Sequence, residues 1–413
     1  MHNQTSKTFR LASGALLMLI GAQSFAADKP TVRPEVGAPL QEAQKALQTK
    51  QYAEAKNQIG KAEAIGKLTP YESYILARLK ASAAIGLNDY KSALSGYETV
   101  LASPELPAAE KLPTLDAYVK IAYASKDYVK TSEGIAKYKA AGGTSAETLG
   151  LYAQSLYLAG KYKEAGAELT SQINALEAAG KRPTDTQLQL LASCALKQND
   201  MVAYTASLEK LVTYSPKKDY WLDLILRTAQ RPGFSQNLAL DVYRLRSATG
   251  TLEKPNDFME ASQLALQAGF PGEAQKFLDD GYKAKALGTG PDASRHQRLK
   301  DLIARKLAED KATLAEGEKA AAAQPTGDAL VSTGFNLVAY GDYAKGIPLM
   351  DQGLKKGGLK SIDQAKLHFG YAYLLAGKKD LAEKTFAGVQ GTDGSKNLAR
   401  LWTLQARSAP AKK

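Results

Sequence analysis

The chain has 413 residues, 44% of them hydrophobic and 23% charged, a length that fits two or three ordinary domains or one long array of repeats. Its formal net charge of +12 comes from 54 Lys and Arg against 42 Asp and Glu, and the excess is spread along the whole length. Such a distribution favours solvated helix surfaces or an anionic partner. The sequence has no patch of basic and aromatic residues that would indicate nucleic-acid binding. The one cysteine, Cys194, excludes an internal disulfide framework, so packing must stabilise the fold.

The N-terminal residues follow the three-part pattern of a secretory signal peptide. Lys7 and Arg10 form the basic part, residues 11–22 form an apolar part too short to cross a bilayer, and small residues at 24 and 26 form a cleavage site. We therefore expect residues 1–26 to be a signal peptide cleaved after Ala26, and the mature protein to be periplasmic without a transmembrane segment. A buried N-terminal helix is the alternative interpretation.

Prolines mark the segment that follows. Residues 27–39 hold Pro30, Pro34 and Pro39 in a polar context and are predicted to form a flexible leader. From Leu40 onward Ala and Leu are abundant, long alternating runs of β-branched residues are missing, and short Gly, Asn or Asp turns interrupt the sequence at regular intervals. This pattern predicts a chain that is helical almost throughout.

One turn recurs along the sequence. A Gly, Asn or Lys turn leads into a Tyr, and a small residue follows three positions after the Tyr. The clear copies are centred on Tyr52, Tyr90, Tyr162 and Tyr343, and the weaker copies on Tyr128, Met201, Pro271 and Lys379. From Tyr52 to Met201, successive turns are 34 to 39 residues apart.

This repeat resembles the tetratricopeptide repeat (TPR) family, whose helix–turn–helix unit is about 34 residues long with small residues at fixed positions. The small residue of the first helix and the bulky residue of the second helix match as well, at Ala43, Ala81, Ala153, Ala192, Gly334 and Gly370, and at Ile59, Tyr97, Leu169, Leu208, Met350 and Phe386. The resemblance implies an all-α fold, a right-handed α-α superhelical solenoid of TPR-like helix hairpins. A generic helical bundle with coincidental turns is the alternative.

The repeats predict two solenoid segments. Residues 40–287 form an N-terminal TPR-like solenoid, which includes a degenerate hairpin at 217–254. Residues 288–325 hold a Gly/Pro linker, the expected domain boundary, and a long bridging helix. Residues 326–406 hold the C-terminal TPR-like repeats and a capping helix, because terminal repeats need a covering face, and residues 407–413 are a disordered tail.

Side chains suited to catalysis are sparse. After the expected cleavage His296 and His368 are the only histidines, far apart and without a nearby Cys, so neither a metal site nor a Ser-His-Asp arrangement is predicted. The repeats reach nearly to the C-terminus and leave no room for a lysozyme-like catalytic domain, which some lytic transglycosylases with a helical superhelix carry. We expect no catalytic residues, no cofactor and no enzymatic activity.

The TPR resemblance also implies a binding surface, the concave face lined by the first helices. Carried onto this sequence, the groove positions are Arg78, Asp116, Lys120, Tyr123, Gln154, Tyr157, Gln189 and Tyr371. Aromatic residues beside mixed polar groups suit an extended peptide or a helix, with Tyr and Arg as anchors, although Tyr residues also pack between helices. The Lys/Asn carboxylate clamp of chaperone-binding TPR proteins is missing, which argues against C-terminal chaperone tails.

Three functional hypotheses follow. The first is a periplasmic protein-interaction scaffold in envelope assembly or a transport complex. The second is a binder of anionic polysaccharide or envelope glycan that assists its export; a connected Lys/Arg stripe and strongly salt-dependent binding would favour it. The third is a structural bundle or an enzyme with hidden chemistry, which a deep pocket with convergent carboxylates would favour.

Overall fold

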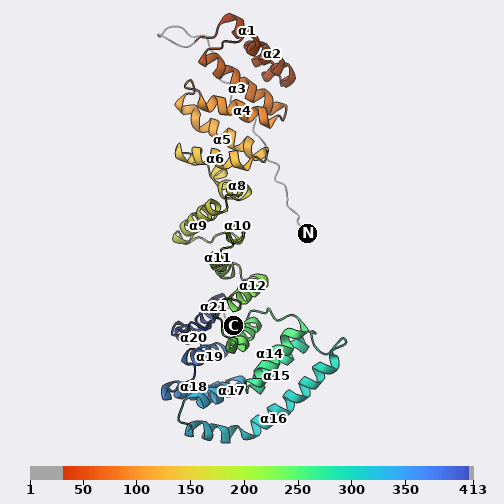
Figure 1. Cartoon of the computed structure of the whole chain (residues 1–413), viewed down its shortest axis with the longest axis vertical. Coiled ribbons are helices and arrows are strands. Elements are labelled where there is room, and N and C mark those ends of the chain that lie inside the picture. Colours follow the sequence, from red (N-terminus) through yellow and green to blue (C-terminus); the bar gives the residue numbers. More distant parts are fainter. Residues whose placement is uncertain (1–30, 409–413) are drawn as a thin grey trace. The chain divides into compact units, whose positions relative to one another are not determined.

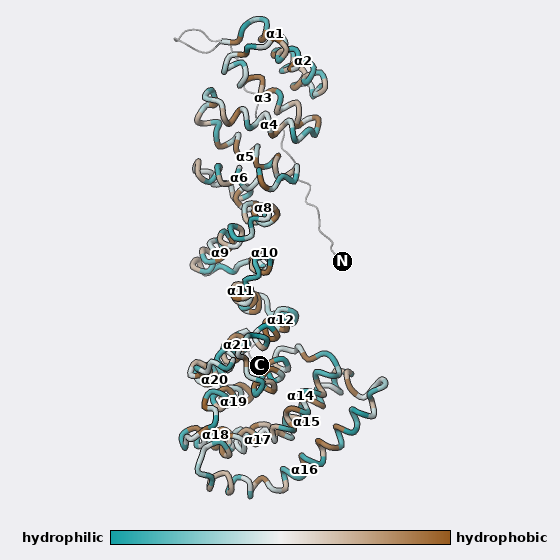
Figure 2. The backbone as a smooth tube through the Cα atoms, viewed as in Figure 1, coloured by the Kyte–Doolittle hydropathy of each residue, from teal (hydrophilic) through white to brown (hydrophobic). Residues whose placement is uncertain are grey.

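The computed structural model describes residues 31–408 (Figure 1). In this range the chain is built from helices joined by short turns and has no strand, so the prediction of an all-α array of TPR-like hairpins is confirmed. Hydrophobic and hydrophilic residues alternate along most of the helices (Figure 2). The expected signal peptide and its cleavage site lie outside the described residues.

The chain forms two compact units that divide between Leu149 and Gly150, not at the predicted linker near Gly288. In the first unit each helix packs on the next, as α1 on α2, α3 on α4 and α5 on α6. The helices that begin in this unit are α1 (Pro34–Gln48), α2 (Tyr52–Ala64), α3 (Pro70–Gly86), α4 (Tyr90–Ala102), α5 (Ala108–Ala124), α6 (Tyr128–Ala140) and α7 (Ala146–Gly150), the last residue of which belongs to the second unit.

The second unit continues with hairpins of the same kind. Its helices are α8 (Tyr152–Leu158), α9 (Tyr162–Ala178), α10 (Asp185–Lys197), α11 (Met201–Tyr214), α12 (Lys218–Ala229), the 3₁₀ turn η1 (Gln236–Leu238), α13 (Ala239–Ala248), α14 (Pro255–Gln267), α15 (Pro271–Lys283), α16 (Ala293–Ala323), α17 (Asp328–Ala339), α18 (Tyr343–Lys356), α19 (Ile362–Leu375), α20 (Lys379–Ala387) and α21 (Ser395–Ser408). The long helix α16 lies within the segment predicted to hold a bridging helix, and it contacts α15 and α17.

The eight predicted turns share one backbone feature. In every copy, the residue two positions before the second helix has a positive φ, between 55° and 87°, at Lys50, Asn88, Lys126, Gly160, Asn199, Gly269, Gly341 and Gly377. A left-handed residue ends a helix because its N–H and that of its neighbour reach the last free carbonyls, and Gly and Asn adopt it most easily. The recurring Gly, Asn or Lys is thus the helix stop of each hairpin.

Helix α1 begins earlier than the predicted leader allowed. Pro34 occupies the first turn of the helix, where the missing N–H costs nothing, so a proline in this segment starts a helix instead of preventing one. Val36 and Leu40 are buried in the core of the first hairpins. Residues 34–39 of the predicted leader are therefore helical. At the other end α21 extends to Ser408, into the predicted tail.

A buried carboxylate fastens this first helix. Glu72 is fully buried and receives bonds from the Arg33 side chain at 2.9 to 3.2 Å and from the backbone N–H of Arg33 at 2.9 Å. It also closes a capping box with Thr69, so one carboxylate starts α3 and holds the residue that precedes α1. The hydrogen bond from Arg33 is the main reason why the pKa of Glu72 falls to about 2.

The second unit closes on itself through its last helix. Helix α21 packs against α19 and α20 and also against α11, α12 and α13. The backbone N–H of Ser235 donates to the carbonyl of Asp393 at 2.8 Å, and the Gln364 side chain donates to the carbonyl of Asn237 at 3.1 Å. The predicted capping helix therefore covers the middle of the chain as well as the last hairpin, and residues 150–287 and 326–406 share one core.

Arg244 lies at the centre of this closure, 1% exposed. Its guanidinium makes a two-bonded pair with Glu273 of α15, at 2.8 and 2.7 Å, and a 2.8 Å bond to Asp241 of its own helix. His368 of α19 places Nε2 2.8 Å from Arg244 Nη1 and 2.9 Å from Asp241 Oδ1. Burial alone would raise the pKa of Asp241, but the neighbouring His368 and Arg244 outweigh it and hold that pKa well below its usual range.

We predict that Arg244→Met destabilises the second unit by about 3–5 kcal/mol, because it leaves two buried carboxylates without a counter-charge. Both tryptophans of the chain, Trp221 and Trp402, are buried in this unit, so tryptophan fluorescence during urea unfolding follows it selectively. The control is Lys276→Met, which breaks an exposed ion pair with Asp280 and should cost less than about 1 kcal/mol. Equal effects of the two substitutions would contradict the proposed role of the buried network.

A second prediction concerns acid. Because the pKa of Glu72 is about 2 in the folded chain against 4.5 ordinarily, its stabilising effect is complete above pH 4.5 and is lost as the pH falls toward 2. The difference in amide hydrogen-exchange protection of α1 between wild type and Glu72→Gln should therefore shrink between pH 5 and pH 2. Glu63→Gln, at an exposed pair with Lys80, is the matched control. A difference that stays constant over this range would refute the prediction.

Candidate functional site

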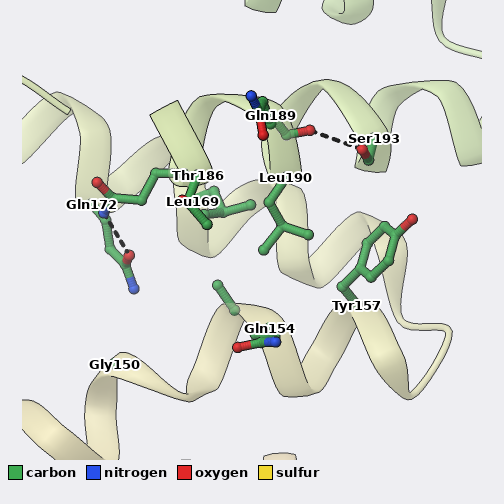
Figure 3. Close-up of a pocket in the computed structure, with 11 residues that line it drawn as sticks. Gly150, Gln154, Tyr157, Leu169, Gln172, Thr186, Gln189, Leu190 and Ser193 are labelled. Carbon is green, nitrogen blue, oxygen red and sulfur yellow. Dashed lines mark hydrogen bonds between the residues drawn. The ribbon is translucent and has the colours of Figure 1, made fainter. Parts of the chain in front are cut away.

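A cavity of about 430 Å³ lies between α8, α9 and α10 in the second unit (Figure 3). Its floor is apolar, formed by Ala153, Leu169 and Leu190. Its walls carry neutral side chains that can form hydrogen bonds, namely Gln154, Tyr157, Gln172, Thr186, Gln187, Gln189 and Ser193. We call this site the amide groove.

Helical spacing brings the wall residues together. Gln154 and Tyr157 are three residues apart on α8, and Gln189 and Ser193 are four apart on α10, so each pair shares a helix face. The Ser193 hydroxyl donates to the backbone carbonyl of Gln189 at 2.8 Å (Figure 3). Helix α10 starts at a capping box, in which Gln187 binds back to Thr184, and this fixes where the helix enters the groove.

The amides of the groove differ in how far they are already bonded. Gln187 donates to Gln172 at 3.4 Å, and Gln172 donates to Glu168 at 3.0 Å, so this wall is held in place. The Gln189 amide nitrogen donates to the Tyr220 hydroxyl, which leaves its carbonyl oxygen available. Gln154 makes no side-chain hydrogen bond in the described structure and can both donate and accept.

No Lys, Arg, Asp, Glu or His borders the amide groove. The nearby Cys194 is buried, and its burial raises the pKa of the thiol to about 11, so it is not a reactive thiolate. Within residues 31–408 no group of three or more His, Cys, Asp or Glu could hold a metal ion. What the groove can do is bind a neutral group through hydrogen bonds and apolar contact.

The predicted groove residues of the first unit form ion pairs with their neighbours. Arg78 of α3 lies 3.1 Å from Glu110 of α5, while Lys120 of α5 lies 2.9 Å from Asp116 and 3.2 Å from Glu147 of α7. Thr148 also donates to Asp116. These charged side chains connect the first helices of successive hairpins, as the TPR resemblance implies for that face. They form ion pairs with one another, so their charges are already neutralised within the chain.

The predicted tyrosines lie in different environments. Tyr123 packs edge-on against Tyr128 with ring centres 5.9 Å apart, and Tyr157 packs in the same way on Tyr162 at 5.2 Å while still lining the groove. Tyr371 is 8% exposed, between Trp402 of α21 and Phe335 of α17. Its prediction as a groove residue is wrong, because closure of the second unit covers that face of α19.

Three of the eight predicted residues thus converge in one site, Gln154, Tyr157 and Gln189. Sequence reasoning missed Gln172 and Gln187. Gln172 lies on the second helix of its hairpin, outside the family's groove positions, and Gln187 lies in the first turn of α10, where it closes the capping box. The cluster of glutamines between residues 154 and 189 was the signal that could have revealed them.

Comparison with known proteins gives fold neighbours only. No family model and no curated protein matches the chain. Among solved structures it is similar to the C-terminal part of a TPR repeat-containing protein from Cytophaga hutchinsonii (20% identity, 62% of this chain and 98% of that one, TM-score 0.27). It is also similar to yeast Tom70 (12%, 90% and 95%, TM-score 0.25) and to the TPR domain of P58(IPK) (13%, 90% and 99%, TM-score 0.22). At TM-scores of 0.22 to 0.27 these similarities support no argument about the partner or the function of this chain.

Proposed function

We propose that this chain is a non-enzymatic scaffold that binds an extended segment of a protein partner in the amide groove. The observation that carries the proposal is the lining itself, an apolar floor between neutral amide walls with free donors and acceptors. The lining includes hydroxyl groups but no His, Lys or carboxylate that could activate them as a general base, which is why binding is proposed and catalysis is not.

An extended peptide fits this lining for two reasons. A glutamine amide presents one donor group and one acceptor, the same pair that each residue of a peptide backbone presents, so Gln154 and Gln189 can bind a main chain. The floor at Leu169 and Leu190, beside the ring of Tyr157, accepts an apolar side chain. Recognition of this kind depends on the backbone and the shape of the peptide and not on its charge.

The proposed compartment is the periplasm, in envelope assembly or a transport complex. The support is the signal-peptide pattern of residues 1–26. In the part of the chain that the structure describes, no helix combines the length and the hydropathy needed to cross a membrane. An anionic glycan in the amide groove is disfavoured, since no cation lines it.

We predict that Gln154→Ala/Gln189→Ala weakens binding of uncharged extended peptides about tenfold, the loss expected for two neutral hydrogen bonds. The measurement is fluorescence polarisation with a library of labelled ten-residue peptides that differ in charge. Affinity should change little between 50 and 500 mM NaCl, because no ion pair contributes.

The matched control is Gln275→Ala/Gln297→Ala, which removes two exposed amides of the same unit, each bonded to an aspartate four residues on. This variant should bind as wild type does. Equal loss in both variants, a strong dependence on salt, or no binding of any peptide would refute the proposed function.

A further inference from the structure

A concentration of positive charge lies at the end of α15 and the start of α16, far from the amide groove in sequence. Residues 281–308 hold seven Lys and Arg and two Asp, a net charge of +5, whereas residues 309–323 hold two Lys and four Asp or Glu, a net charge of −2. The end of α15 and the loop after it meet the start of α16 in space. Lys300 lies over the Tyr282 ring at 4.8 Å, and the N–H of Gly288 donates to His296 at 3.2 Å.

Three arginines form a row along α16. Arg295, Arg298 and Arg305 are all exposed. By helix geometry Arg298 and Arg305 lie on one face two turns apart, with Arg295 a turn before them, so the row is about 15 Å long. Leu299 and Ile303, on an adjoining face of the helix, are buried.

Most other arginines of the described residues are held in ion pairs. Of the nine outside the α16 row, seven form ion pairs, and Arg182 and Arg231 do not. None of the three in the α16 row forms an ion pair among the described residues. Lys283 and Lys285, at the adjoining end of α15, are also exposed and unpaired.

The order of basic and acidic residues along α16 is unfavourable for the stability of this helix. A helix favours acids near its N-terminus and bases near its C-terminus, because its free N–H groups give the N-terminus a partial positive charge. Helix α16 has the reverse order, with no acid in its first turn and no base in its last turn. Arg295 and Arg298, three residues apart, also stand within reach of each other, where like charges repel. The fold therefore does not account for these two arginines.

We infer that the α16 row is a binding surface for a linear acidic polysaccharide. An arginine fork binds a carboxylate or a phosphate with two parallel bonds, and a row of forks matches charges repeated along a polymer. The site is separate from the amide groove, and the inference does not depend on the proposed function.

The surroundings of the row argue against other polyanions. A membrane-surface helix inserts apolar side chains, and a protein partner needs apolar anchors, yet none of the exposed large hydrophobic residues lies between Leu226 and Tyr343. Single-stranded nucleic acid needs exposed rings for stacking, and Lys300 covers the nearest ring, Tyr282.

The test is binding of the purified chain to polygalacturonate at 50 mM NaCl, with uncharged dextran as the negative probe. Arg295→Gln/Arg298→Gln/Arg305→Gln should weaken binding at least about tenfold and flatten its dependence on salt. The matched control is Lys163→Gln/Lys345→Gln/Lys379→Gln, which removes three exposed, unpaired cations elsewhere in the same unit and should bind within about twofold of wild type.

Several outcomes would overturn the inference: equal loss in both variants, no binding of polygalacturonate, or a row-dependent binding of poly-glutamate or phosphatidylglycerol vesicles that exceeds that of the polysaccharide. Gln154→Ala/Gln189→Ala should bind polygalacturonate as wild type does, and the row variant should still bind peptides. Failure of one site is thus distinguishable from failure of the other. Removing the reversed charges should also leave the unfolding midpoint of the second unit unchanged or raised, which excludes misfolding as the cause of lost binding.

Discussion

The buried guanidinium of Arg244 is the interaction on which the second unit depends. A charge at this depth is tolerated only with full compensation, and Arg244 obtains it from Asp241 beside it and Glu273 on α15. The rings of Phe270 and Phe335 cover its faces at 5.4 and 4.7 Å. Because His368 of α19 completes the cluster, the C-terminal hairpins cannot leave the centre of the unit without exposing paired charges and aromatic surface together.

This closure decides which surfaces remain for binding. It buries Tyr371 and leaves His368 only partly exposed, so the face of α19 that a TPR solenoid would present to a ligand is occupied by the chain itself. In the first unit the equivalent face is occupied by ion pairs such as Arg78 with Glu110. The amide groove of α8–α10 lies before the closed part of the chain and keeps unbonded polar atoms, which is why it is the better candidate site.

How much of the structure could be predicted from the sequence depends on how many residues separate the interacting groups along the chain. The hairpin turns were predictable because a left-handed stop such as Asn88 and a cap such as Asp89 act within a few residues. Gln154 and Gln189 were predictable because family positions fix the face of a first helix. The contact between Arg244 and His368 spans 124 residues and has no local signal, so the closure, the burial of Tyr371 and the actual division into units were missed.

Local charge patterns are informative in a different way, because the structure shows whether each group of charges stabilises the fold or destabilises it. The Arg33–Glu72 pair and the Arg244 cluster each place opposite charges in contact, and the fold accounts for both. The arginines of α16 do the opposite: all three face solvent without an ion pair, and Arg295 and Arg298 lie near the N-terminal end of their helix within reach of each other. An anion outside the chain explains this arrangement better than the fold does.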